Sequence, residues 1–500
     1  MQVQVQKTGM SAERGVFLTR SSVLFYALLC ALVVYQYQYH EHSQESSSRD
    51  LSEDMDAMDH HHDHHHHKDI FPLDTSDYVG TFLIIIGLMI AASGGIGGGG
   101  IIVPLLILVF GFSPKKAIPL SNFTILGSSL TNMLMNLSKR HPHTDRPLID
   151  WNLIMVMEPL TVGGAVCGTF LSKVLPDLVL TIMLVVLLAL TAHRTLTKGI
   201  GQFKKEAAEF KESQRSALAK AVDEVDDEEE SSASQALLEK EESDVKKSPM
   251  DIETQAAEDY EALELSAILE QEKGTPLDKV VLLVVMFAVL ITLNFLKGGG
   301  ESFPSPIGIE CGGTEYWAVT FLIFAWVLAI AAYMRTQLIS MWKAKKRLRY
   351  KYVEGDVEWD ERNTLIYPFL CIFAGFCAGM FGVGGGIVKG PLMLEMGVHP
   401  MVASGTVAVM IFMTSISATT SYMAFGTLTY DYAFFLFFFG LVATAVGQLG
   451  VGYLVKKYKR MSLISLSIGA VIALSTLLMG FQSVLSLFSE GNEDSNKLCT

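Results

Sequence analysis

The sequence predicts an all-α fold: a polytopic helical membrane protein with two inverted repeats, each opening with a glycine-broken or re-entrant helix pair. Half of the 500 residues are hydrophobic, and only 18% are charged. The hydrophobic residues stand in long blocks, and about 18 or more apolar residues are long enough to cross the ~30 Å hydrocarbon core as a helix. Backbone groups in lipid must be hydrogen-bonded internally, which makes helices the default spanning structure. Two similar glycine-rich segments indicate the repeat.

The first element, residues 1–37, is interpreted as an amino-terminal signal anchor. Its apolar run at 22–35 follows Lys7, Arg14 and Arg20. A positive flank before a short apolar stretch is typical of a signal sequence or signal anchor. No small-residue cleavage site is evident before residue 36, which favours an uncleaved anchor.

The remaining domains follow from alternating polar and apolar composition. A polar His- and Asp-rich segment at 38–77 precedes membrane repeat 1 at 78–196, and a charged, acidic cytoplasmic linker with two amphipathic helical pieces fills 197–277. Connecting transmembrane helices at 278–335 and a basic cytoplasmic loop at 336–363 lead to membrane repeat 2 at 364–487 and a polar tail at 488–500. The predicted apolar segments lie at 79–110, 117–137, 153–174, 178–192, 280–296, 316–334, 365–396, 402–425, 432–455 and 462–487.

The repeat rests on two glycine-rich motifs. GIGGGGIIVPL runs from Gly95 to Leu105, and GVGGGIVKGPL runs from Gly382 to Leu392. Four glycines, the proline and the leucine of the two motifs pair at one constant offset. After a slip of one position, a second set pairs, including Ser128 and Ser129 with Thr414 and Ser415. Such agreement is a strong repeat signal, although glycine and leucine are common in membrane segments.

The glycine runs interrupt their helices. Residues 79–92 and 101–111 are each too short to cross a bilayer. The glycines between them favour unwound backbone, which is tolerated at membrane depth only inside protein or beside a water-filled cavity. The element is therefore a re-entrant hairpin or one broken span.

Loop charges choose between these two forms, because cytoplasmic loops carry the excess of Lys and Arg. The basic loops at 139–146, 194–198, 343–351 and 456–460 are all cytoplasmic only if each glycine element enters and leaves on one face. Nine full crossings result, with the amino terminus inside and the carboxyl terminus outside. Five crossings separate the glycine elements, so the halves are inverted, as in many secondary transporters. This scheme puts Lys115 and Lys116 on the side of the membrane away from the cytoplasm, which counts against it.

At this point the chain resembles the sulfite exporter TauE/SafE family of membrane permeases, in its eukaryotic form. The likeness rests on the glycine segment that ends at Pro104, the following stretch at 117–129, the second copy from Gly382 through Thr406, and the motif at Glu158. It covers roughly 78–196 and 278–487. The resemblance implies export or uptake of small sulfur-containing anions or related organic acids. It does not imply which one, because the family is chemically broad.

The glycine breaks are the first candidate site. Helices that start after them point free N–H groups and the positive end of the helix dipole into the break. Two opposed helix starts near the midplane make an anion site without charged side chains. The alternative is that the glycines only allow close helix packing. The candidate substrate-binding glycines are Gly97, Gly98, Gly99, Gly100, Gly384, Gly385 and Gly386.

Small polar residues follow each break and add candidate donors to an oxyanion. Each can equally bond to a carbonyl one turn earlier or join helices. The candidates are Ser121, Asn122, Ser128, Ser129, Thr406, Thr414 and Ser415.

Two charged residues lie inside predicted spans. Lys389 follows the second glycine run, where the first copy has Ile102. A lysine at membrane depth is a functional candidate; it contacts the anion or snorkels to the interface. Glu158 is a candidate to carry a coupled proton, and structural pairing with a polar group is the alternative.

The polar segment before repeat 1 contains a histidine tract. Imidazoles suit zinc, nickel or copper, but the spacing is undefined, so the tract is a weak metal buffer or simple low-complexity sequence. Its residues are His60, His61, His62, His64, His65, His66 and His67.

Three functions compete. The first is a transporter of a small anionic substrate, with a coupled proton, embedded in the lipid bilayer. The second is a divalent metal-cation transporter fed by the histidine tract, although its spans lack several Asp, Glu or His ligands. The third is a non-transporting receptor or scaffold. An enzyme and a nucleic-acid partner are disfavoured, because no catalytic constellation and no broad basic patch appear, and no cofactor is expected. The six cysteines show no metal or disulfide spacing.

Overall fold

The computed structural model describes residues 75–94, 97–226, 263–298, 304–353, 355–458 and parts of 469–483. These residues all belong to one compact unit, Ile70–Thr500. Within them the regular secondary structure is helical, apart from one isolated bridge between Arg140 and Pro147. Seven described helices are long and apolar enough to cross a membrane. The predicted all-α, multi-pass membrane fold is confirmed.

The labelled helices follow the predicted apolar segments closely. In the first part they are α2 (Thr75–Gly94), α3 (Gly99–Leu108), α4 (Pro114–Leu137), α5 (Trp151–Val174) and α6 (Asp177–Asp226). After the linker come α8 (Leu277–Lys297), α9 (Thr314–Arg347), α10 (Asn363–Phe381), α11 (Gly386–Glu395), α12 (Pro400–Ala424) and α13 (Tyr430–Tyr458).

Each glycine element is a helical hairpin. Gly80 near the start of α2 lies against Phe110, which follows α3, and Gly87 lies against Ile101 at the start of α3. In the second copy, Gly385 at the start of α11 lies against Ala378 and Ala374 of α10. The short helix therefore runs back along the long one. Of the two forms considered, the contacts favour the re-entrant hairpin.

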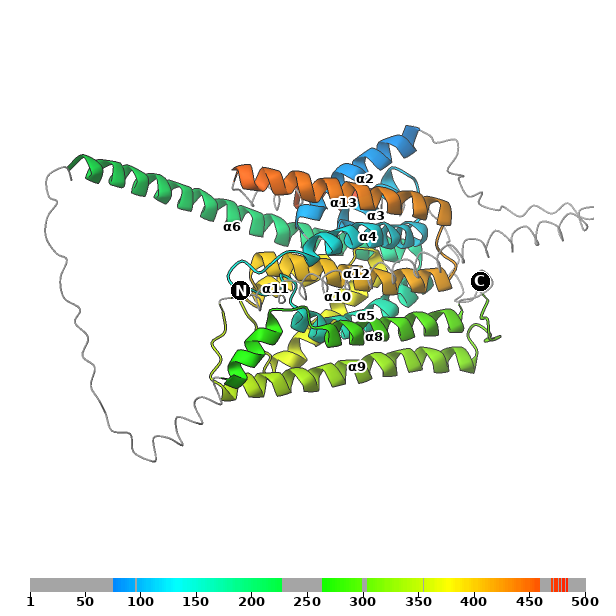
Figure 1. Ribbon diagram of the computed structural model, residues 1–500. Helices are drawn as coiled ribbons and strands as arrows, with labels where there is room; N and C mark the ends of the chain where they lie inside the picture. Colours follow the sequence, from blue (N-terminus) through cyan, green and yellow to red (C-terminus); the bar gives the residue numbers. More distant parts are fainter. Residues whose placement is uncertain are drawn as a thin grey trace, which may run out of the picture. The chain divides into compact units, whose positions relative to one another are not determined.

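The core is built where the two copies interlock. Figure 1 shows α4, α5, α10 and α12 between the neighbouring pair α2 and α13 and the neighbouring pair α8 and α9. Glycines allow the closest contact, between α5 and α10: a side chain at Gly164 or Gly375 would collide with backbone of the other helix. Such contacts of small residues are the usual way in which membrane helices associate without a hydrophobic driving force.

The corresponding helices α4 and α12 run antiparallel. Asn136 at the end of α4 lies beside Gly405 near the start of α12. At the other end, Ser121 of α4 and Tyr422 of α12 bond to Gly382 and Gly379, which are close together in the chain. This arrangement is the one an inverted repeat requires, and the inversion itself remains a prediction.

Three expectations about local structure need correction. Helix α2 has 20 residues, more than the run predicted at 79–92, although its apolar part, Asp77–Ala92, is still one of the shorter apolar helices. Helix α10, with 19 residues, is one of the seven candidate spans, whereas α3 and α11 have 10 residues each. Helix α6 continues to Asp226, and α9 continues to Arg347, into segments expected as linker and loop. Their charged residues are good helix formers, so the helices run on beyond the apolar run. Cys311 is disulfide-bonded, which the spacing did not indicate.

Candidate functional site

A charged cluster lies at the centre of the helices. The Lys389 Nζ atom is 2.9 Å from Glu158 Oε2 and 2.7 Å from Thr414 Oγ1. The Thr414 hydroxyl lies 2.8 Å from Glu158 Oε1. All three side chains are fully buried. We call Glu158, Lys389 and Thr414 the Lys389 cluster.

Three helices from both copies position this cluster. Glu158 lies in the middle of α5, one residue before Pro159, and Thr414 lies in the middle of α12. Lys389 lies on the first full turn of α11, directly after the second glycine break. Opposite charges that share a neutral hydroxyl satisfy one another in a low dielectric, where an unpaired charge would be very costly. The sequence alone named Lys389 and Thr414 as candidate contacts to the anion and Glu158 as a candidate proton carrier, without bringing the three together.

The two glycine breaks meet each other. A Cβ atom built on Gly99 would lie 2.4 Å from Val383 Cα and 2.6 Å from Gly382 O. The Ser121 hydroxyl donates to Gly382 O at 2.7 Å and ties α4 to the second break. Gly97 and Gly98 have φ of 80° and 77°, in the left-handed region that favours glycine. Glycine is therefore required here both by conformation and by contact.

The short helices begin where the breaks meet. Gly100 is the second residue of α3, and a Cβ atom there would lie 3.1 Å from Ile387 Cδ1, on the second residue of α11. Gly384, Gly385 and Gly386 occupy the turn before and at the start of α11, with Gly385 as its left-handed N-cap. Both helix starts are thus adjacent, and each carries first-turn N–H groups without intrahelical acceptors.

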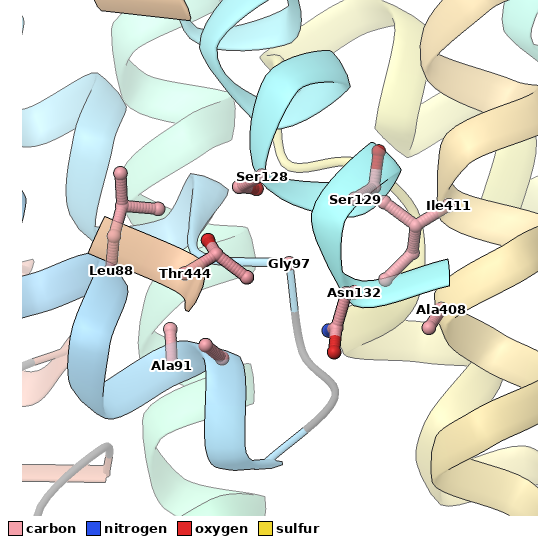
Figure 2. Close-up of a pocket in the computed structure, with 10 residues that line it drawn as sticks. Leu88, Ala91, Gly97, Ser128, Ser129, Asn132, Ala408, Ile411 and Thr444 are labelled. Carbon is pink, nitrogen blue, oxygen red and sulfur yellow. The ribbon is translucent and has the colours of Figure 1, made fainter. Parts of the chain in front are cut away.

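A small cavity opens beside the first break. It is lined by Gly97, Ser128, Ser129, Asn132 and Thr444, with apolar residues of α2 and α12. Figure 2 shows these side chains around the non-helical backbone at Gly97. The cavity has a volume of about 10 Å³, which is room for roughly one water molecule. In this conformation it does not accommodate an oxyanion.

Some of the other predicted polar residues already make hydrogen bonds within the protein, and others have a polar atom without a partner. The Ser128 and Ser129 hydroxyls donate to carbonyls of their own helix. Thr406 accepts the N–H of Asp150 and closes the start of α12 onto α5. Asn122 Oδ1 and Ser415 Oγ are buried without a hydrogen-bond partner in the described part of the chain. The last two are the donors and acceptors still available to a bound molecule.

Sequence reasoning overlooked two polar residues of α13. Thr444 lines the cavity, and Gln448 donates to Asn132 Oδ1 and to Ala92 O at the end of α2. A polar amide inside an apolar segment was a signal for Gln448, whereas a single threonine such as Thr444 carries almost none.

The histidine tract falls outside the described residues. Within the described ranges, no group of three or more His, Cys, Asp or Glu side chains is placed to hold a metal ion.

The loops at the basic end of the helices form a second polar region. Arg146 forms an ion pair with Asp356, and it lies 3.3 Å from His141 Nε2. Burial, followed by the charge of Arg146, lowers the pKa of His141 to about 4. The loop before α5 and the loop before α10 are therefore joined by charge, at the end where α9 carries its basic last turn.

The seven candidate spans, the helical hairpins and the buried Lys389 cluster define a polytopic helical membrane protein. The family described as sulfite exporter TauE/SafE matches residues 79–222 and 279–479. The chain belongs to this family, as the sequence resemblance predicted.

Curated relatives from Arabidopsis thaliana agree with this assignment. Sulfite exporter TauE/SafE family protein 3 is 27% identical over 412 residues, which cover 82% of this chain and 79% of the relative. Family protein 2 is 28% identical over 427 residues, or 84% and 85% of the two chains. Family protein 5 is 26% identical over 408 residues, or 82% and 83%. The search of solved structures found no significant match.

Proposed function

We propose that this protein transports small anions, sulfite or another sulfur-containing or organic anion, by alternating access around the two glycine breaks. The observation that carries the proposal is the Lys389 cluster, because it places an ammonium group at the start of a half-helix between the two copies. The names of the family and its relatives support sulfite as the first substrate to test.

The chemistry of the Lys389 cluster supports a step in which an oxyanion replaces Glu158 as the partner of Lys389. In the present conformation Glu158 neutralises Lys389, so no net charge is buried at this point. An incoming oxyanion competes with Glu158 for the same ammonium group. A carboxylate left without its cation in a low dielectric favours the protonated form. Glu158 therefore takes up a proton as the anion binds, which couples the two movements.

The glycine breaks supply the remaining donors. The first-turn N–H groups of α3 and α11, and the positive ends of their dipoles, stabilise an anion between them. Binding there involves backbone of both copies, and relative movement of the copies would alternate access to the two sides. The antiparallel course of α4 and α12 supports the inverted repeat that such a cycle requires.

The size of the cavity supports assigning this conformation to an occluded, unloaded stage. A space for about one water beside Gly97 must widen before an oxyanion enters. The Ser121 bond to Gly382 O, which ties α4 to the second break, is one contact that has to change.

The test uses the full-length protein in liposomes loaded with sulfite, thiosulfate or zinc. We expect efflux of at least one of the two anions to exceed the efflux from loaded liposomes that contain no protein. Lys389→Met should lower it at least tenfold, and Glu158→Gln should remove its dependence on an imposed pH gradient. Lys343→Gln, on an exposed surface of α9, is the matched control for loss of a lysine. Zinc flux without anion flux would favour the metal-cation alternative, and absence of all three fluxes would favour a receptor or scaffold.

A further inference from the structure

A second group of cationic and hydrogen-bonding side chains lies far from the Lys389 cluster. Lys297 ends α8, and its Nζ atom lies 4.6 Å from the ring centroid of Tyr316 in the first turn of α9. The same Nζ atom is 5.6 Å from the ring centroid of Phe425, which follows α12. Lys173, near the end of α5, lies 5.4 Å from that Phe425 ring. Together with Asn294 we call these residues the Lys297 cluster.

The Lys297 cluster holds positive charge without an ionic partner at its centre. Lys297 is 3% exposed, and no carboxylate of the described residues lies within ion-pair distance of its Nζ atom. Its Nζ atom faces the two aromatic rings, and cation–π attraction offsets only part of the loss of hydration. A second ammonium group, from Lys173, shares the Phe425 ring. Two like charges around one ring repel each other, and an anion between them would relieve that repulsion.

Hydrogen-bond donors of the cluster are also unsatisfied. The Tyr316 hydroxyl and the Asn294 side-chain amide are buried, with 1% of each residue exposed, and neither has a partner within the described part of the chain. Asn294 stands one turn before Lys297 on the same helix. Buried donors without acceptors are costly. An ammonium, a phenol and an amide together are a donor set that suits an oxyanion.

The position of the cluster relates it to the Lys389 cluster. Helix α5 carries both Glu158 and Lys173, and α12 carries Thr414 and leads to Phe425. At 1.5 Å per residue, the two clusters are about 16–22 Å apart along these helices. Between the clusters, buried Ser417 stands about one turn after Thr414 on α12, and its hydroxyl has no partner among the described residues. An anion that moves along this side of α12 would therefore meet an unpartnered hydroxyl between the two clusters.

The neighbouring aromatic residues place the Lys297 cluster near a membrane surface. Trp317 is 39% exposed and packs edge-on against Tyr316 and Phe170. Tryptophan and tyrosine gather where the bilayer meets water. The cluster lies at the start of α9, whereas the basic loops lie at its end, so the cluster and those loops are at opposite ends of this helix (Figure 1).

We infer that the Lys297 cluster is a second anion-binding station, at which a small oxyanion docks between membrane surface and Lys389 cluster. The inference rests on the proposed function only for the statement that the anion moves between the Lys297 cluster and the Lys389 cluster. Binding at the station itself does not depend on transport. Lys297 and Tyr316 contact the anion, and Lys173 adds to the positive potential.

A local probe tests binding directly. The chain has five tryptophans, and replacing all but Trp317 by phenylalanine leaves a reporter beside Tyr316. Titration of the purified full-length protein with sulfite, at constant ionic strength, should change the Trp317 fluorescence and reach saturation. Lys297→Met should raise the half-saturating concentration at least fivefold, and Tyr316→Phe two- to threefold. Lys297→Arg should remain within twofold of the parent, because it restores the charge.

Two comparisons distinguish anion binding at the station from a purely structural role of Lys297. Lys343→Gln, which removes an exposed lysine from the opposite end of α9, should leave the Trp317 titration unchanged. A structural role for Lys297, as a cation at the end of α8, predicts lower thermal stability but the same half-saturating concentration in Lys297→Met, and that result would overturn the inference. If the protein shows no anion flux but sulfite still changes the Trp317 fluorescence with saturation, the proposed function is contradicted. The inference that the Lys297 cluster binds an anion then still stands.

Discussion

Lys389 and Glu158 are 231 positions apart in the chain, yet their side chains form a 2.9 Å ion pair that no solvent reaches. The pair joins α11 of the second copy to α5 of the first. In the predicted repeat Lys389 corresponds to Ile102, so only one of the two glycine-rich segments carries the charge. Such a pair is weak evidence for stability, because desolvation offsets most of its attraction. We therefore propose that the pair serves function rather than stability.

The energetic coupling of the pair is measurable. We expect Glu158→Gln and Lys389→Met each to destabilise the protein by about 3–5 kcal/mol, because each leaves one buried group without its partner. The double variant should lose clearly less than the sum, since it leaves no isolated charge. Unfolding in detergent, followed through loss of helical signal, gives the three values. Additive losses would show that the two side chains do not interact as described.

The contact between the breaks predicts a contrast between two glycines. Gly99→Ala places a methyl group against the backbone of Val383 and Gly382, and should destabilise the protein by about 1–3 kcal/mol and reduce transport. Gly390→Ala, inside α11, meets nothing within 4 Å and should be neutral or stabilise by up to about 1 kcal/mol. Thermal unfolding of both variants checks this. Equal effects of the two would contradict the close approach of the breaks.

The loop cluster predicts a dependence of stability on pH. Burial and Arg146 lower the pKa of His141 to about 4, below its unfolded value near 6.5. The unfolded chain therefore binds this proton first, and stability falls as the pH is lowered from about 6.5 to about 4. The loss attributable to His141 should be on the order of 1–2 kcal/mol, allowing for solvent screening.

His141→Gln should remove this part of the pH dependence. The groups that face His141 are Arg146, Asp356, His143 and His399, and the exposed His143 provides the control His143→Gln. If both variants keep the wild-type slope between pH 6.5 and pH 4, His141 is not the titrating group.

Residues 136–138 read Asn-Leu-Ser, a glycosylation sequon, and because the loop that follows is predicted to be cytoplasmic, its asparagine should carry no glycan. Asn136 lies in the last turn of α4, is 5% exposed, and donates its amide to Asn132 O at 2.8 Å. Glycosylation requires an accessible side chain in an extracytoplasmic loop. Glycosidase treatment of protein from eukaryotic cells should leave its electrophoretic mobility unchanged at this site, as judged against Asn136→Gln. A shift that Asn136→Gln abolishes would overturn the predicted topology.

Much of the fold was predictable because lipid restricts the backbone. Apolar length identified the spans, and consecutive glycines identified the breaks, since few other residues adopt the left-handed conformation seen at Gly98 and Gly385. Helix ends were less predictable. Helix α6 runs on to Asp226 and α9 to Arg347, because charged residues with high helix propensity continue a helix beyond the membrane.

The site was predictable in part. Glu158, Lys389 and Thr414 each stood out as polar residues in an apolar setting, but their roles were assigned separately, and the substrate-binding residues remain proposals. Ser121 was proposed as a ligand, and its hydroxyl instead holds Gly382 O in this conformation. Thr444 gave no signal, because a threonine in an apolar helix is common and its hydroxyl usually bonds to its own backbone. Tyr316 gave none, because a tyrosine near the end of a membrane helix is common.

The sequence by itself determined that this chain crosses the membrane as helices, that its two copies each contain an unwound glycine run, and that it resembles the sulfite exporter TauE/SafE family. Only the tertiary structure decided that the breaks touch, that Lys389 pairs with Glu158, and that Lys297 gathers with Tyr316 at a helix end. The physical reason is the distance along the chain over which each kind of interaction acts. Hydrophobicity and backbone conformation act locally along the chain, whereas these contacts join helices that are distant in sequence and meet only through packing.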